Sequence, residues 1–209
     1  MTPPHSPPHH LSSRFDEAFM YASQLHKGQV RKGTQIPYVS HVLAVASIAL
    51  EHGADENEAI AALLHDAVED AGGPPVREEI RKRFGEEVAQ IVDGCTDTDE
   101  SPKPPWRARK EAYISHLRDA APSVSLVSAA DKLHNSRAIL LDYRALGDQL
   151  WERFNADKHE ILWYYRSVTD VFRETKNVPS ALLEELERVI AEMSRLASSE
   201  PRGDKRNLV

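Results

Sequence analysis

The chain has 209 residues, of which 41% are hydrophobic and 28% are charged, and its formal net charge is −7. This balance is typical of a globular protein and excludes a chain that is disordered throughout. The single cysteine, Cys95, excludes an intramolecular disulfide and a thiolate zinc cluster. The acidic net charge argues against a nucleic acid polymer as partner, while a local cluster of cations or a metal still allows an anionic small molecule.

The two ends of the chain are expected to lie outside the folded domain. The first twelve residues contain four of the 13 prolines and three of the ten histidines, which predicts a disordered leader over residues 1–11. The polar residues 199–209 are expected to form a flexible tail. There is neither a secretory signal nor an apolar run of the roughly 18 residues that a membrane span needs, so we expect no membrane partner and a cytoplasmic location.

Residues 12–198 have helical periodicity almost throughout, without a convincing alternating strand pattern. Capping residues, glycines and prolines divide this pattern into helices. The expected helices run, in chain order, from Ser12 or Ser13 to about Gly28, from Ser40 to Gly53, from Asp55 through Val68 to a stop at Gly72-Gly73-Pro74, and over residues 76–84, 86–92, 106–117, 124–143, 156–175 and 180–197. The sequence therefore predicts an all-α fold with a single domain. Two loops, residues 28–39 and 94–105, interrupt the pattern and are the first places to look for binding residues.

Four ionisable residues gather in the third expected helix: His65, Asp66, Glu69 and Asp70. At helical spacing His65 lies over Glu69 and Asp66 over Asp70, near the buried margin of the helix, where an unpaired carboxylate is costly. A divalent ion that binds the imidazole and the carboxylate together would remove that cost. The alternative is a solvated acidic helix end.

Asp131 stands among small apolar residues in a later helix and shares a helix face with Asn135. Small residues before an acid let another helix approach closely, as a shared site needs. The alternative is a capping acid, or one that is paired with Lys132 or Arg137.

His41 follows a proline-containing turn, which can aim a ring nitrogen inward; the alternative is a capping or core histidine. Together with His65, Asp66 and Asp131 it forms a mixed nitrogen and oxygen donor set. Such a set, without thiolate, suits Mn²⁺, Fe²⁺, Mg²⁺ or Zn²⁺. Spacing alone leaves open whether the three helices converge.

Several ordered motifs resemble the (p)ppGpp hydrolase domain of the RelA/SpoT type, within the HD superfamily of metal-dependent phosphohydrolases. The likeness covers about residues 12–175. It is carried by residues 26–32 (His-Lys-Gly-Gln-Val-Arg-Lys), 37–41 (Pro-Tyr-Val-Ser-His), 61–70 (Ala-Ala-Leu-Leu-His-Asp-Ala-Val-Glu-Asp), 84–85 (Phe-Gly), 92–96 (Val-Asp-Gly-Cys-Thr) and 130–135 (Ala-Asp-Lys-Leu-His-Asn).

The resemblance implies a single HD-domain helical bundle that uses one Mn²⁺ ion to remove the 3′-pyrophosphate of a (p)ppGpp-like alarmone. The residues that match the family's functional positions fall into three groups: the metal ligands His41, His65, Asp66 and Asp131; the acidic pair Glu69 and Asp70, which orients and deprotonates water; and the substrate-binding residues Arg31, Lys32, Asn135, Arg109 and Lys110.

The sequence departs from the family pattern in the loop that follows Lys32. Residues 33–36 (Gly-Thr-Gln-Ile) are one more than usual before Pro37, and Val42 replaces the proline that usually follows the histidine. The longer loop leaves the preferred purine open. One alternative function is therefore hydrolysis of another nucleotide, such as (p)ppApp, NADPH or a nucleoside monophosphate; the other is a metal-binding regulatory module without turnover.

Overall fold

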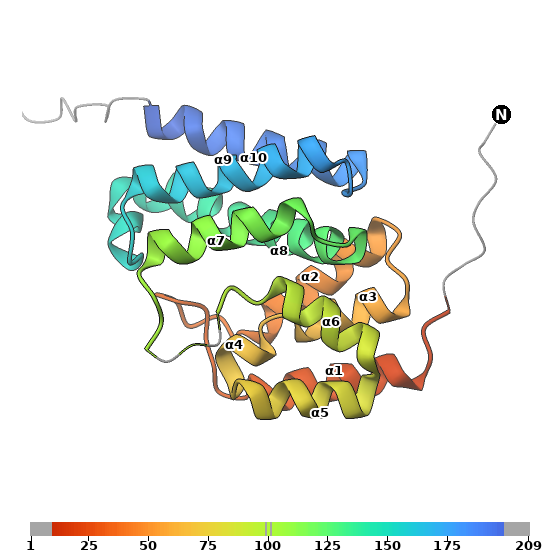
Figure 1. Cartoon of the computed structure of the whole chain (residues 1–209). Coiled ribbons are helices and arrows are strands. Elements are labelled where there is room, and N and C mark those ends of the chain that lie inside the picture. The colour runs from red at the N-terminus through yellow and green to blue at the C-terminus, as the bar shows by residue number, and fades with distance from the viewer. Residues whose placement is uncertain (1–9, 99, 101, 199–209) are drawn as a thin grey trace, which may run out of the picture.

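The computed structural model describes residues 10–98, 100 and 102–198, and within these the fold is all-α, as the sequence predicts (Figure 1). The predicted tail 199–209 and all but the last two residues of the predicted leader lie outside the described residues. The helices are α1 (Ser13–Leu25), α2 (Val39–Glu51), α3 (Glu56–Leu64), α4 (Ala67–Ala71), α5 (Pro74–Phe84), α6 (Glu86–Cys95), α7 (Trp106–Arg118), α8 (Pro122–Leu146), the 3₁₀-helix η1 (Gly147–Arg153), α9 (Lys158–Thr175) and α10 (Ser180–Ser198).

The helix starts follow local capping chemistry. Ser12 accepts a hydrogen bond from the amide of Arg14 at the start of α1. Asp55 and Glu58 form a reciprocal capping box at the start of α3. Each cap satisfies amide groups that the first helical turn leaves unpaired, which is why these boundaries were readable from the sequence.

The long helix α8 is the centre of the structure and contacts α2, α3, α6, α9, α10 and η1. In Figure 1, α9 and α10 lie on one side of α8, and α1 and α5 form the opposite edge of the molecule. Buried side chains from all these layers form one continuous core. As a result α8 brings residues from its middle turns into contact with both α2 and α3, where the candidate site residues lie.

The third helix differs from its predicted form, because it does not continue from Asp55 through Val68. It ends at Leu64, and α4 begins at Ala67 after a break at His65 and Asp66. The His65 ring nitrogen Nδ1 lies 2.8 Å from the carbonyl oxygen of Ala62, an acceptor that the amide of residue 66 would use in an uninterrupted helix. The side chains of His65 and Asp66 therefore project from a kink.

The loop between α1 and α2 is closed by an isolated antiparallel bridge between Val30 and Pro37. Backbone hydrogen bonds also join Arg31 to Ile36 and Gln29 to Tyr38. These pairs shape residues 29–38 into a narrow turn, from which Arg31 reaches Asn135 in the middle of α8. In the described part of the chain, no helix is both long and apolar enough to cross a bilayer.

Candidate metal centre and its two cavities

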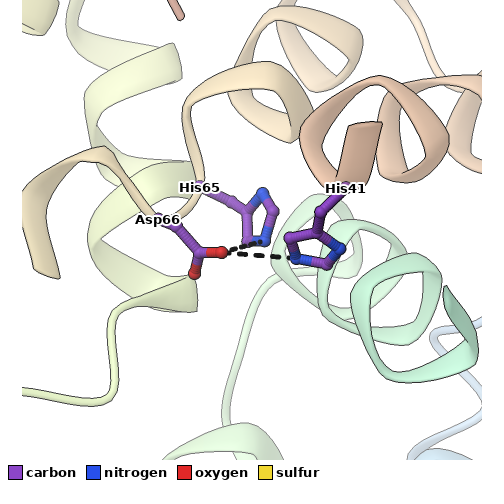
Figure 2. Close-up of side chains that lie close together, drawn as sticks. All are labelled: His41, His65 and Asp66. Carbon is purple, nitrogen blue, oxygen red and sulfur yellow. Dashed lines mark ion pairs between the residues drawn. The ribbon is translucent and has the colours of Figure 1, made fainter. Parts of the chain in front are cut away.

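Three separate segments bring the four predicted ligands together. Nε2 of His41, on α2, lies 3.3 Å from Asp66 Oδ2 and 3.3 Å from Asp131 Oδ1, on α8. Nε2 of His65 lies 3.0 Å from the same Asp66 oxygen and 3.6 Å from the same Asp131 oxygen. Figure 2 shows His41 and His65 both directed at the Asp66 carboxylate. The predicted convergence of three helical segments is therefore present in the structure.

Each histidine ring is fixed through its other nitrogen. His65 Nδ1 lies 2.8 Å from the Ala62 carbonyl oxygen and donates to it, so Nε2 is the nitrogen that faces the carboxylates. Burial lowers the pKa of His65, but Asp66 and Asp131 raise it well above its usual range, so without a cation Nε2 holds a proton. His41 Nδ1 lies 2.7 Å from Nδ1 of His134, and one ring must donate to the other. Burial and the neighbouring His41 lower the pKa of His134 to about 4, so His134 is neutral and able to accept. With Nδ1 as the donor in both rings, both Nε2 atoms are directed at the same two carboxylate oxygens, where a bound cation would replace the proton.

The donor set fits a divalent cation. The Nε2 atoms of His41 and His65 are buried and lack a well-formed hydrogen bond within the described residues. Ligand atoms of His41, His65 and Asp66 all lie within 4.8 Å of one another. Burial alone would raise the pKa of Asp66, but His65 and His41 hold it well below its usual range. Unpartnered nitrogens facing ionised carboxylates are what a metal of intermediate hardness requires.

Both carboxylates are held by further side chains. Tyr38 donates its hydroxyl hydrogen to Asp66 Oδ2 at 2.5 Å, and burial and this acid raise the pKa of the tyrosine. Asp131 accepts from Lys132 through Oδ2 and from Asn135 through Oδ1, each at 2.5 Å. The ion pair with Lys132, expected as an alternative to a metal role, is thus present. It leaves Oδ1 facing the histidines, so the two roles are compatible.

The acidic pair lies beside this centre. Glu69 is paired with Lys103 at 2.8 Å. Asp70 Oδ2 accepts a hydrogen bond from the side-chain amide nitrogen Nε2 of Gln29 at 3.1 Å. The side-chain oxygen Oε1 of Gln29 lies 2.7 Å from Nδ1 of the buried His26. Burial and the charge of Asp66 raise the pKa of Asp70. The Asp70 carboxylate is therefore a stronger base than a carboxylate on the protein surface.

A cavity of about 880 Å³ opens on one side of the centre. Its volume is within the range of sites for cofactors and drug-sized ligands. Three predicted substrate-binding residues line it: Arg31, Lys32 and Asn135. Arg31 donates to the Asn135 side-chain oxygen at 2.7 Å, and Lys32 donates to Asn155 at 3.1 Å. The turn before α2 is therefore tied to α8 and to the segment after η1.

A smaller cavity, of about 240 Å³, lies on the other side. Its lining includes Asp66, Glu69, Asp131 and the lysines Lys110 and Lys132. Lys110 also lies 3.1 Å from Asp97, but burial and the neighbouring Lys132 lower the pKa of Lys110 to about 7. The two cavities share part of their lining, Tyr38, Asp70, Asn135, Phe154 and Tyr165, so they adjoin each other. Two of the shared residues, Tyr38 and Asn135, contact the candidate ligands Asp66 and Asp131.

Arg109 is placed differently from the other predicted substrate-binding residues. Its guanidinium group pairs with Asp97 and donates to the Pro104 carbonyl at 3.2 Å. It is absent from the lining of both cavities, whereas its neighbour Lys110 reaches the smaller one. Arg109 therefore braces the loop before α7.

Sequence reasoning assigned no role to three residues that touch the site: Gln29, Tyr38 and His134. All three fall inside the motifs that carry the family resemblance, which was the available signal. Their partners are Asp70, Asp66 and His41, which are distant in sequence, so the contacts follow only from the tertiary structure.

Comparison with known proteins places this geometry in a family. Residues 18–161 match the model of the HD domain. The chain is 40% identical over 124 residues to a guanosine-3′,5′-bis(diphosphate) 3′-pyrophosphohydrolase, MESH1, of Xenopus tropicalis; the match covers 58% of this chain and 66% of that protein. It is 36% identical over 126 residues to a guanosine-3′,5′-bis(diphosphate) 3′-pyrophosphohydrolase of Haemophilus influenzae, over 57% of this chain and 18% of that one.

Two solved structures share the fold. A metazoan orthologue of SpoT, described as hydrolysing ppGpp, superposes with a TM-score of 0.71 at 28% identity and covers 88% of this chain and 97% of its own. A protein of Listeria monocytogenes superposes with a TM-score of 0.65 at 28% identity, over 74% of this chain and 99% of its own. The match spans less than a fifth of the long Haemophilus relative, so the likeness concerns one domain of that protein. The chain belongs to the HD domain family.

Proposed function

We propose that this protein is a Mn²⁺-dependent hydrolase that removes the 3′-pyrophosphate of (p)ppGpp-like alarmones, giving GDP or GTP and pyrophosphate. The observation that carries the proposal is the meeting of two imidazoles and two carboxylates at the wall of a small cavity that adjoins a larger one. Relatives that carry this activity in their names support the choice of substrate. The boundaries 12 and 198 of the domain and the cytoplasmic location stay predictions.

In this proposal His41, His65, Asp66 and Asp131 hold the metal. The mixed nitrogen and oxygen donors suit Mn²⁺, and the fixed tautomers of both rings leave Nε2 free to bind it. A bound divalent cation acidifies water and neutralises phosphate charge.

The two cavities offer a physical reason for cleavage at a pyrophosphate. The larger one, with Arg31, Lys32 and Asn135 in its lining, has the volume and the apolar surface for a nucleoside. The smaller one has room for a compact anionic group, and Lys110 and Lys132 supply positive charge there. The scissile phosphorus would lie where the cavities meet, next to the metal ligands. Arg109 contributes by holding Asp97 beside Lys110.

Glu69 and Asp70 handle the proton of the attacking water. Both line the smaller cavity, and Asp70 also lines the larger one. Lys103 holds Glu69, and Gln29 orients Asp70. A carboxyl group with a raised pKa accepts a proton from water more readily than an ordinary acid, which fits Asp70 for general base catalysis.

The deciding experiment measures pyrophosphate and phosphate release separately from ppGpp and from its adenosine analogue, with and without Mn²⁺. The proposal expects Mn²⁺-dependent release of pyrophosphate without free phosphate. Release of phosphate, or turnover only of another nucleotide such as NADPH or a nucleoside monophosphate, favours the alternative hydrolase. Metal binding without turnover of any nucleotide favours the regulatory module.

A further inference from the structure

One face of α8 leads from the metal centre along the larger cavity. Asp131, Asn135, Ala138 and Asp142 follow one another at intervals of four, three and four residues, so they lie on one face of the helix. The last three line the larger cavity. At a rise of about 1.5 Å per residue, Asp142 lies roughly 16 Å along the helix axis from Asp131. Asp142 therefore marks the end of the cavity that is remote from the metal.

The carboxylate of Asp142 is held in place but remains available. Nη1 of Arg153, in η1, donates to its Oδ2 at 2.8 Å. Its Oδ1 has no hydrogen-bond partner among the described residues, and the side chain is 37% exposed. Gly33 leaves room for the Arg153 side chain, since a Cβ atom there would lie only 2.6 Å from the arginine Cδ. The Gly33 backbone also has a positive φ of +72°, which favours glycine.

The surroundings fit a flat heteroaromatic ring. Ala138 adds only a methyl group to the cavity wall, and Ile36, Leu150 and Phe154 add apolar surface. Among the described residues the cavity lining holds two carboxylates, Asp70 and Asp142, and Asp70 belongs to the hydrolytic end. The edge of a ring seated here would meet Asp142.

A carboxylate distinguishes the two purines by chemistry alone. An ionised carboxylate only accepts hydrogen bonds. Guanine presents two neighbouring donors, N1–H and the N2 amino group, whereas adenine presents an acceptor at N1 and has no amino group at C2. A site that is built to bond with donors rejects an analogue that lacks them, because its own polar group is left unpaired.

We propose that Asp142 is the specificity-determining residue that binds the N1–H and N2 edge of guanine, with Arg153 holding its carboxylate. This inference rests on the proposed function and specifies guanine as the base of the substrate. Asp142 is linked to the lengthened loop 33–36 through Arg153, which packs against Gly33, and Thr34 and Ile36 of that loop line the same cavity.

The test compares kcat/KM for ppGpp and its adenosine analogue in the parent protein and in Asp142→Asn. The asparagine keeps an oxygen for Arg153 but adds a donor that opposes guanine and suits adenine N1. We expect the guanosine substrate to lose about 10- to 100-fold in kcat/KM, with no loss for the adenosine substrate. Glu152→Gln is the matched control: this exposed acid of η1 lies outside the cavity lining, and its variant keeps the parent preference.

A second arm changes the substrate and leaves the protein intact. The inosine analogue of ppGpp lacks only the N2 amino group, and the parent should use it about 10-fold less well than ppGpp. The inference is overturned, while the proposed function stands, if the parent protein has the same kcat/KM for the guanosine, inosine and adenosine substrates. It is also overturned if the ratio of kcat/KM for the guanosine and adenosine substrates is the same in Asp142→Asn as in the parent. If the parent cleaves none of these substrates, the proposed function fails, and calorimetry with GDP and ADP then tests the role of Asp142. Equal affinities for GDP and ADP reject that role. Tighter binding of GDP than of ADP, lost in Asp142→Asn, supports it.

Discussion

His41 and His134 face each other through their Nδ1 atoms at 2.7 Å, with ring centroids 4.8 Å apart. The contact joins α2 to α8 and fixes the tautomer in which His41 directs an unprotonated Nε2 at Asp66 and Asp131. His134 also lines the larger cavity. It therefore lies between the candidate metal centre and the larger cavity.

We expect His134→Phe to weaken metal binding about 10- to 100-fold, because the ring stays while the acceptor for His41 is lost. His134→Gln, which retains an acceptor, should recover part of the affinity. Isothermal titration with Mn²⁺ measures both, and exposed His116→Phe on α7 serves as the control. Equal Mn²⁺ affinity in the parent and His134→Phe would show that the histidine pair plays no part in positioning.

Metal binding and proton handling should be separated by two kinds of variant, at the proposed ligands and at Glu69. Asp131→Ala removes one proposed ligand and should abolish both metal retention and turnover, and His65→Ala should do the same. Glu69→Gln should keep the metal but lower kcat by about two orders of magnitude or more, because the amide cannot take the proton. Metal content and single-turnover rates are the measurements. Parent-like turnover by Glu69→Gln contradicts the role assigned to that acid.

Gln29→Leu should shift the acidic limb of the kcat/KM profile to higher pH. The Gln29 amide stabilises the ionised form of Asp70 and so lowers its pKa, against the upward effects of burial and Asp66. Lys103 and His26 also favour the charged form and stay in place. Loss of the amide raises the pKa, so more of Asp70 is protonated and inactive at a given low pH. A profile that matches the parent limb rejects this positioning role.

Lys110 should make substrate capture sensitive to pH near neutrality. Its pKa of about 7 means that the ammonium group is present below pH 7 and is lost as the pH rises above it. The positive charge of Lys110 attracts the substrate phosphates, so kcat/KM should fall as the pH rises above 7 and the charge is lost. Lys110→Arg stays charged and should flatten the fall. The profiles of the two proteins are compared at constant ionic strength, and identical limbs rule Lys110 out as the group responsible.

A substitution at Gly94 tests whether the close approach of α6 and α8 matters for stability. A Cβ atom built at Gly94 would lie 2.6 Å from a methyl carbon of Val124. Gly94→Ala should therefore destabilise the fold by about 1–3 kcal/mol despite its better helix propensity. Val124→Ala in the same chain should restore part of the loss, which gives a measurable coupling energy in denaturant unfolding. A Gly94→Ala protein as stable as the parent contradicts the tight contact.

The sequence by itself determined the all-α fold class, and it predicted most helix positions and the donor set of the candidate centre. Helix starts such as Ser12 and Asp55 were legible because capping is a contact between neighbours in the chain. His41, His65, Asp66 and Asp131 stood out because imidazole and carboxylate groups are costly inside apolar helices unless they are paired.

Only the tertiary structure decided how these groups face one another. The kink at His65 and Asp66 replaces a predicted continuous helix, because a buried ring takes the acceptor that the helix backbone would use. The contact of His41 with His134 spans 93 residues, and the pairing of Asp142 with Arg153 depends on η1 folding back onto α8. Such contacts depend on packing between distant segments, and helical periodicity reports only which face of each segment is buried.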